Sequence, residues 1–109
     1  MRVHTVPMRV VKPSRIRGFQ DAFPKAAAGL GRWLELVEQN NWGSIQQLRR
    51  VFPAADAVRV QSGRTVTVFN IGGNDYRLIT AIHYNTRIVY TMLFLTHAEY
   101  DKAAWKERL

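Results

Sequence analysis

Four residues in the C-terminal half of the chain have side chains suited to chemistry on a phosphate group. Arg77 follows Tyr76 in an apolar run. A guanidinium is permanently charged and forks onto two phosphate oxygens. His97, Tyr100 and Asp101 stand at positions i, i+3 and i+4, so they would share one face of a helix. An imidazole titrates near neutral pH, and a phenol can donate a proton. These residue types could stabilise negative charge at Arg77 and transfer protons from the helix.

Structural roles compete with these assignments. Arg77 could be a surface arginine of a strand, paired with Asp75 or Asp101. Asp101 could instead orient a neighbouring histidine. Tyr100 could be a core aromatic, because residues 104–105, an alanine and a tryptophan, continue its stripe along the helix. The residue types alone leave these alternatives open.

A strong positive charge points to a polyanionic partner. Lysines and arginines number 16 against 8 acidic residues, which gives a net charge of +8 and a pI near 10.6. A small basic domain is attracted to nucleic acid, although a basic surface kept for solubility is the alternative. The asparagines beside the glycines are also common for turn formation alone. The candidates for contact with phosphate or RNA are Arg49, Arg59, Arg64, Asn70, Asn74 and Arg87.

Three apolar strands are predicted to hold Arg77 and to lead into the helix of His97. Gly72–Asn74 permits the positive φ that tight hairpins need. Thr96 and Glu99 form a capping-box pattern, which predicts a helix start directly after the last strand. The strands are rich in β-branched and aromatic residues and form an antiparallel meander of Thr65–Ile71, Tyr76–Tyr84 and Arg87–Leu95.

The remaining segments favour a single α+β domain over residues 1–109, with residues 1–7 as a possible N-terminal extension. The helices are expected to cover mainly one face of the sheet and to leave the other face to a ligand. Ser44 and Gln47 form a second capping-box pattern before a short helix. The other predicted elements are a strand Met8–Lys12, a helix from Pro13 to Phe23, a helix Pro24–Gln39, a strand Ala57–Gln61 and a last helix from His97 to about Glu107.

Several classes of protein are disfavoured. The chain has no cysteine, which excludes disulfides and thiolate metal sites and fits a reducing cytosol. Its three histidines, His4, His83 and His97, lack the spacing of a metal site, so no metal and no other cofactor is expected. No apolar run reaches the roughly 18 residues of a membrane span, and the N-terminus lacks the apolar segment of a signal peptide.

Three spaced motifs carry a resemblance to a known family. They are Phe69–Asn74, Tyr76–Ile79 and Thr96–Asp101, with Arg50–Pro53 fitting upstream. In this order and at this domain length the chain resembles the HigB toxins, members of the RelE-like superfamily of bacterial type II toxin–antitoxin systems. The resemblance covers about Met8 to Lys106.

The resemblance implies a compact α+β fold with a curved, mostly antiparallel sheet and a C-terminal helix. It implies a metal-independent endoribonuclease that cuts mRNA, typically in the ribosomal decoding site, and thereby inhibits translation in the cytoplasm. It also implies a HigA-like helix-turn-helix antitoxin as the partner, no membrane, and a role for Arg77 as the active-site arginine.

The assignment of acid and base stays open at this point. RNA is cleaved without metal by attack of the ribose 2′-OH on the adjacent phosphorus, which needs a base, an acid and a cation. Relatives of this family carry lysines on the strand before the arginine, but Thr65–Ile71 contains none. Two other functions remain: a non-catalytic RNA- or ribosome-binding inhibitor, and a basic domain that binds only the antitoxin.

Overall fold

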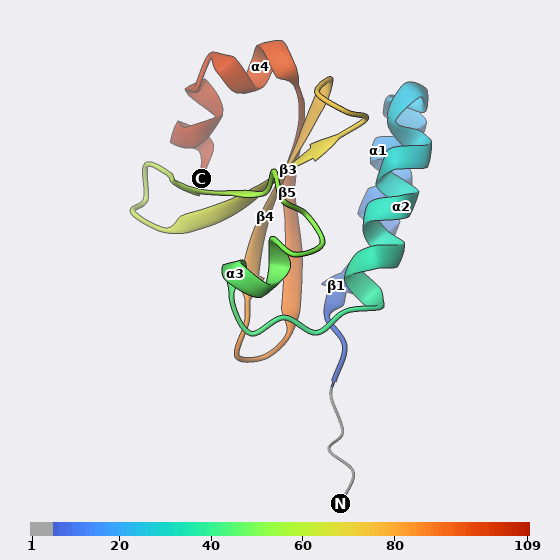
Figure 1. The fold of residues 1–109 in the computed structure, drawn as a ribbon. Coiled ribbons are helices and arrows are strands. Elements are labelled where there is room, and N and C mark those ends of the chain that lie inside the picture. The colour runs from blue at the N-terminus through green and yellow to red at the C-terminus, as the bar shows by residue number, and fades with distance from the viewer. Residues whose placement is uncertain (1–5) are drawn as a thin grey trace, which may run out of the picture.

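The computed structural model describes residues 6–109 and shows a five-stranded sheet with helices on both faces (Figure 1). The predicted α+β class is therefore confirmed. The elements in chain order are β1 (Arg9–Val11), α1 (Ser14–Ala22), η1 (Pro24–Ala26), α2 (Ala27–Glu38), α3 (Ile45–Leu48), β2 (Asp56–Arg59), β3 (Thr65–Ile71), β4 (Tyr76–His83), β5 (Ile88–Thr96), α4 (His97–Asp101) and η2 (Ala104–Arg108).

The sheet has the strand order β1-β5-β4-β3-β2. Neighbours from β2 to β5 are antiparallel, whereas β1 pairs in parallel with β5. Gly72 and Gly73 close the β3–β4 turn with φ of 64° and 69°, values that L side chains rarely adopt. The predicted meander is thus confirmed, and the sheet is mostly antiparallel as expected.

One face of the sheet packs against α1, α2 and α3 (Figure 1). The apolar stripe of α2 contributes Leu30, Trp33 and Val37, each at most 1% exposed. They meet Phe69 and Leu78 of the central strands, and the rings of Trp33 and Phe69 touch edge to face at 5.5 Å. This face holds the larger hydrophobic core of the domain.

The C-terminal segment covers part of the opposite face. Trp105 of η2 is 3% exposed and packs in a second cluster with Val66, Val68, Ile79 and Leu95. The expectation that this face would be left to a ligand is therefore wrong for the area under Trp105.

The last helix is also shorter than predicted. It begins as expected at the capping box, in which the side chains of Thr96 and Glu99 each accept a hydrogen bond from the backbone N–H of the other residue. It ends at Asp101, and the chain turns through Ala103, whose φ is 59°. A left-handed alanine costs roughly 1 kcal/mol. The bend places Trp105 on the second apolar cluster, and the burial of an aromatic side chain outweighs that cost.

The predicted helix Pro24–Gln39 is divided into the 3₁₀ turn η1 and the α-helix α2, which begins at Ala27. The strands β1 and β2 and the helix α1 match their predicted bounds within two residues. The second capping box forms only in part, because Gln47 Oε1 accepts from Gly43 rather than from Ser44. Most of the predicted N-terminal extension, residues 1–5, lies outside the described residues. Within the part of the chain that the structure describes, no helix is long and apolar enough to cross a membrane.

Two glycines of α2 make a matched test of how closely the helix approaches the β3–β4 turn. A Cβ on Gly29 would lie 3.0 Å from Cγ2 of Ile71 and 3.1 Å from the backbone N of Gly72, whereas at Gly31 the nearest atom is 3.5 Å away. We expect Gly31→Ala to raise the free energy of unfolding by about 1 kcal/mol through helix propensity. Gly29→Ala should be less stable than Gly31→Ala by about 1–3 kcal/mol because of overpacking. Urea unfolding of both variants measures the difference, and equal stabilities would contradict the close approach.

Candidate active site

Arg77 lies on β4 and is only 8% exposed, so it is not the surface arginine of the alternative reading. Its Nη1 donates to the backbone oxygens of Asn74 and Tyr76, both at 3.0 Å, and its Nη2 donates to Asn74 Oδ1 at 2.7 Å. Within residues 6–109 it forms no salt bridge, with Asp75, Asp101 or any other carboxylate. The pairings considered from the sequence are therefore wrong, and three uncharged oxygens hold the guanidinium.

This arrangement leaves the charge of Arg77 available. Three of the five N–H donors are used, and Nε and the second hydrogen of Nη2 have no partner among the described residues. These two donors share one edge of the guanidinium, the geometry that binds two oxygens of a phosphate. A buried cation without a counter-charge is costly, so the site favours an anion.

Cross-strand pairing sets what surrounds Arg77. Asn70, Arg77 and Leu95 stand opposite one another on β3, β4 and β5. Directly paired residues share a face, so the exposed Asn70 lies beside Arg77 on the face that the C-terminal segment partly covers. Asp56 of β2 pairs with Val68, two residues before Asn70, and so belongs to the adjoining row.

Tyr100 covers this group from α4. The guanidinium carbon of Arg77 lies 5.5 Å from the centre of its ring, and the ring of Trp105 stacks on it at 5.2 Å. Trp105 Nε1 donates to the backbone oxygen of Tyr100 at 3.0 Å. The ring packs on Trp105, as the core-aromatic alternative predicted, and it also borders the arginine. The predicted role of Tyr100 in proton transfer stays a prediction. The side chain remains partly exposed.

The environment keeps Tyr100 protonated. Burial raises the pKa of the Tyr100 phenol above its ordinary value of 10.0, and the carboxylate of Asp56 raises it further. Arg77 lowers this pKa, and Asp101 raises it slightly. The net shift is upward, so at neutral pH the phenol is a proton donor and not a base.

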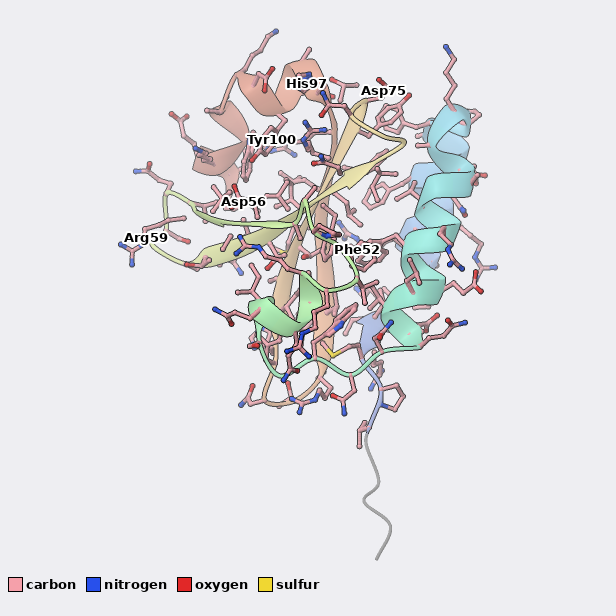
Figure 2. The ribbon with its side chains drawn as sticks, viewed as in Figure 1. Phe52, Asp56, Arg59, Asp75, His97 and Tyr100 are labelled. Carbon is pink, nitrogen blue, oxygen red and sulfur yellow. The ribbon has the colours of Figure 1, made fainter. Side chains whose placement is uncertain are left out.

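His97 and Asp101 form a pair on the exposed side of α4. His97 Nε2 lies 3.4 Å from Asp101 Oδ2. The partner of the Asp101 carboxylate is therefore the imidazole of His97 and not the guanidinium of Arg77. The backbone N–H of His97 donates to the oxygen of Asp75 at 2.8 Å, which ties the helix start to the β3–β4 turn. Figure 2 shows Tyr100 between His97 and Asp56.

The predicted RNA contacts divide into three groups. Asn70, Arg59 and Arg64 are exposed, and Arg59 projects from the end of β2 away from Tyr100 (Figure 2). Arg49 donates to the oxygen of Ala55 at 2.9 Å and pairs with Asp56 at 3.5 Å, and Arg87 donates to Asn41 Oδ1 and the oxygen of Tyr84. Asn74 holds Arg77. The last three residues therefore have structural partners within the protein.

Two contributors were not identified from the sequence. Asp56 lies on a strand distant in sequence, and no local pattern connects it to Tyr100. The sequence suggested Asn74 only as an RNA contact or a turn residue. Its position three residues before Arg77, across a tight turn, is a signal that it could accept hydrogen bonds from the guanidinium. His83 is exposed at the opposite end of β4 from Arg77.

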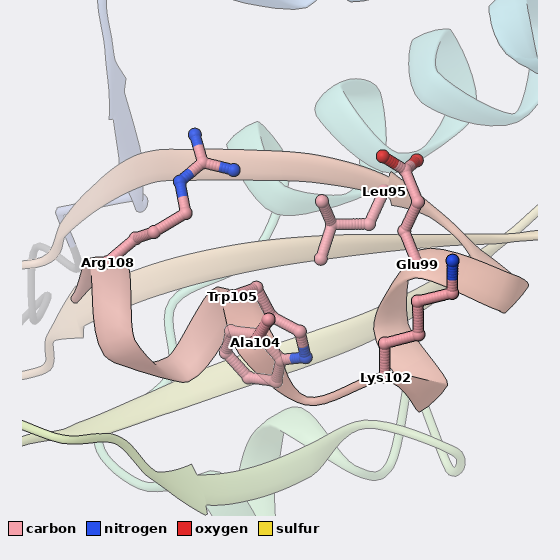
Figure 3. A pocket seen from close by; sticks show the side chains of 6 residues that line it. All are labelled: Leu95, Glu99, Lys102, Ala104, Trp105 and Arg108. Atoms are coloured by element: carbon pink, nitrogen blue, oxygen red, sulfur yellow. The ribbon is translucent and has the colours of Figure 1, made fainter.

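A hollow of about 260 Å³ lies beside the C-terminal segment. Lys102 and Arg108 border it from opposite ends, with Trp105 between them (Figure 3). Glu99, which caps α4, also lines it. None of the predicted catalytic residues lines this hollow. Over residues 6–109 no three histidine or acidic side chains converge in a way that could hold a metal ion.

The hold of Asn74 on Arg77 can be tested by substitution. Asn74→Ala keeps the backbone acceptor and removes only Oδ1, and a hydrogen bond to a charged group is worth about 1.5–3 kcal/mol. We expect the rate of RNA cleavage to fall about tenfold. Asn74→Asp keeps the acceptor but neutralises the guanidinium, so it should cost more than Asn74→Ala. The control is Asn85→Ala, which changes an asparagine in an exposed turn. Full activity in Asn74→Asp would contradict the need for an unpaired positive charge on Arg77.

Comparison with known proteins identifies the family of the chain. The family of HigB toxins, described as the RelE-like toxic component of a toxin–antitoxin system, matches residues 26–103, well over half of the chain. The mRNA interferase toxin HigB of Escherichia coli K12 is 22% identical over 94 residues, which cover 86% of this chain and 88% of that protein. The mRNA interferase HigB of Escherichia coli O6:H1 is 22% identical over 95 residues, covering 87% and 90%. The chain belongs to the HigB family of RelE-like toxins, the toxic components of toxin–antitoxin systems.

Proposed function

We propose that this toxin is an endoribonuclease that cleaves mRNA, by a route in which its own side chains supply the acid, the base and the cation. The observation that carries the proposal is Arg77, a nearly buried guanidinium held by uncharged oxygens with one edge unoccupied. The names of the HigB relatives as mRNA interferases support the same activity.

Arg77 would stabilise the transition state. Attack of the ribose 2′-oxygen on the adjacent phosphorus adds negative charge to the phosphate oxygens, and the two unoccupied N–H donors can bind them. The Asn74 contacts fix the guanidinium before substrate arrives, so little reorganisation is needed during the reaction.

Tyr100 and His97 would divide the proton transfers. The 2′-OH loses its proton to a base, which we assign to His97 with Asp101 orienting it. The bond from phosphorus to the 5′-oxygen breaks, and the leaving oxygen takes the proton of Tyr100, whose raised pKa keeps it protonated. The products are a 2′,3′-cyclic phosphate and a free 5′-hydroxyl. We propose that Asn70, which is exposed and pairs with Arg77 across the strands, contacts the RNA beside the scissile phosphate.

The partners follow from the toxin class. A toxic component of a toxin–antitoxin system has an antitoxin as its partner. We propose that this antitoxin is a HigA-like helix-turn-helix protein and that the toxin acts on ribosome-bound mRNA in the cytoplasm. The net charge of +8 favours association with ribosomal RNA, and exposed Arg59 and Arg64 are candidates for those contacts.

Mapping of mRNA ends in a purified translation system tests the proposal. We expect new 5′-hydroxyl ends within ribosome-occupied codons when the toxin is present, and none when its antitoxin is added. Arrest of translation with intact mRNA would replace the nuclease by a non-catalytic inhibitor. Cleavage of naked RNA at the same rate would remove the dependence on the ribosome.

A further inference from the structure

The helix that carries Tyr100 is too short to fix the position of its own side chains. α4 has five residues, all of them described by the structure, and none of them is buried. A helix shorter than about 12 residues is marginal in water by itself, because few hydrogen bonds offset the cost of its first turn. The capping box and the β3–β4 turn hold the start of α4. Its C-terminal end, where Tyr100 lies, therefore depends on another anchor.

Trp105 supplies this anchor from η2. Its side chain is 3% exposed and packs in the second apolar cluster with residues of three strands, Val66, Val68, Ile79 and Leu95. The backbone also ties η2 to the sheet, because the N–H of Gln61, between β2 and β3, donates to the oxygen of Lys106 at 3.1 Å. Leu95 is the residue of β5 that pairs with Arg77. The indole is thus fixed to the sheet beside the row that contains Arg77.

Two contacts join Trp105 to Tyr100. The two rings stack with 5.2 Å between their centres and 20° between their planes. Trp105 Nε1 donates to the backbone oxygen of Tyr100 at 3.0 Å, and this oxygen belongs to the last turn of α4, where carbonyls lack partners within the helix. The single N–H of an indole lies in the plane of the ring, so the hydrogen bond also sets the orientation of the indole. Trp105 therefore holds both the backbone and the ring of Tyr100.

The ring of Tyr100 in turn lies against the guanidinium of Arg77, whose central carbon is 5.5 Å from the centre of the ring. A phosphate bound by Arg77 has its leaving oxygen near this ring. A displacement of about 1 Å in a reacting group can cost about 100-fold in rate. The position of the Tyr100 hydroxyl is therefore important for proton transfer.

We propose that Trp105 is a positioning residue for RNA cleavage, which holds the ring of Tyr100 beside the guanidinium of Arg77 and so places the phenol proton at the leaving 5′-oxygen. The inference rests on the proposed function, in which Tyr100 is the general acid. It goes beyond the burial of Trp105 in the second cluster, because it assigns the indole an effect on the reaction.

A matched tryptophan separates positioning from general stability. Trp42 is also 3% exposed, but it lies in the larger core on the other face of the sheet, where its ring meets that of Phe52 at 5.9 Å. Trp42→Leu and Trp105→Leu each replace a buried indole by a smaller apolar side chain. Both variants should unfold at lower temperature than the wild type. Only Trp105→Leu should change the chemistry at Tyr100.

The kinetic test compares these variants below their melting temperatures. Trp105→Leu should lower kcat for mRNA cleavage about 10- to 100-fold with little change in KM, because it misplaces a group that acts in the transition state. Trp105→Phe keeps a ring that can stack on Tyr100 and loses the N–H donor, so it should retain more activity. Trp42→Leu should keep kcat near that of the wild type. An unchanged kcat in Trp105→Leu, or an equal loss in the two leucine variants, would overturn the proposal.

A double-mutant cycle tests whether Trp105 acts through Tyr100. In Tyr100→Phe the phenol proton is already absent, so the addition of Trp105→Leu should lower kcat by less than the same change does in the wild type. Losses that multiply fully would show that the two residues act independently, and they would overturn the positioning role.

Titration of the phenol keeps this inference distinct from the proposed nuclease. Burial is the main cause that raises the pKa of Tyr100. Loss of the indole exposes the phenol to water, so its pKa should fall toward 10.0 in Trp105→Leu and stay unchanged in Trp42→Leu. Ultraviolet difference titration of each variant against the same variant with Tyr100→Phe measures this pKa. If Trp105→Leu does not fold, Trp105→Phe is titrated in its place, with a smaller fall expected.

The outcomes separate the two hypotheses. A lowered Tyr100 pKa in Trp105→Leu supports the placement by Trp105 even if the wild type leaves mRNA intact, a result that would remove only the nuclease. Cleavage by the wild type together with an unmoved Tyr100 pKa in Trp105→Leu would overturn the positioning role and leave the nuclease standing.

Discussion

Replacement of Arg77 by alanine is expected to lower the rate of mRNA cleavage by about 10³-fold. The residue is 8% exposed, has no counter-charge within the described chain, and keeps two donors without a protein partner while three uncharged oxygens hold the others. Removal of the side chain removes the only cation that Tyr100 contacts in the described residues. The measurement is the rate at which new mRNA ends appear in a purified translation system.

Two controls separate catalysis from folding and from charge. Arg77→Lys keeps a positive charge but loses the planar pair of donors, so it should remain at least 100-fold impaired. Arg59→Ala removes an exposed arginine of β2 and should retain most of the activity. Circular dichroism and ribosome binding of Arg77→Ala should match the wild type. Undiminished cleavage in Arg77→Ala would remove the arginine from the mechanism.

Replacement of Tyr100 by phenylalanine should lower cleavage by about 100-fold, at the lower end of the effect of a general acid. Phenylalanine keeps the ring that stacks on Trp105 at 5.2 Å and lies 5.5 Å from the guanidinium of Arg77. Only the proton donor is lost, so stability should change little. Tyr100→Ala should lose stability as well, because it exposes Trp105.

The pKa of Tyr100 determines the pH range over which its phenol stays protonated. Burial and the carboxylates of Asp56 and Asp101 outweigh Arg77, so the pKa is raised above 10.0. The protonated phenol therefore persists to pH values above 10 and is lost only as the pH rises through the shifted pKa. Ultraviolet titration of phenolate, taken as the difference between wild type and Tyr100→Phe, measures it. A Tyr100 that ionises below pH 10 would contradict the assigned environment.

Local sequence patterns determined much of the domain. The bounds of β3 were predicted to the residue, because six of the seven residues from Thr65 to Ile71 are β-branched or aromatic, Asn70 being the exception. The start of α4 followed from Thr96 and Glu99, which stabilise a helix end by contacts within one turn. These features depend on neighbours in sequence, so they can be inferred without the fold. The spaced motifs likewise identified the toxin family.

Long-range packing decided the rest. The periodicity of the last helix continues past Asp101, yet the helix ends there, since Trp105 finds more apolar contact on the second face of the sheet than along a straight helix. The same bend stacks the ring of Trp105 on that of Tyr100, whereas the stripe along a continuous helix predicted only that the two residues share a face.

The candidate site likewise depends partly on local sequence and partly on long-range packing. The sequence by itself determined that Arg77, His97, Tyr100 and Asp101 were the residues with suitable chemistry. Only the tertiary structure decided that Arg77 is buried against Asn74 and not paired with an acid, and that Asp56 of a distant strand acts on Tyr100. Burial and charge are properties of a three-dimensional neighbourhood, and strand register and helix packing create that neighbourhood from residues far apart in the chain.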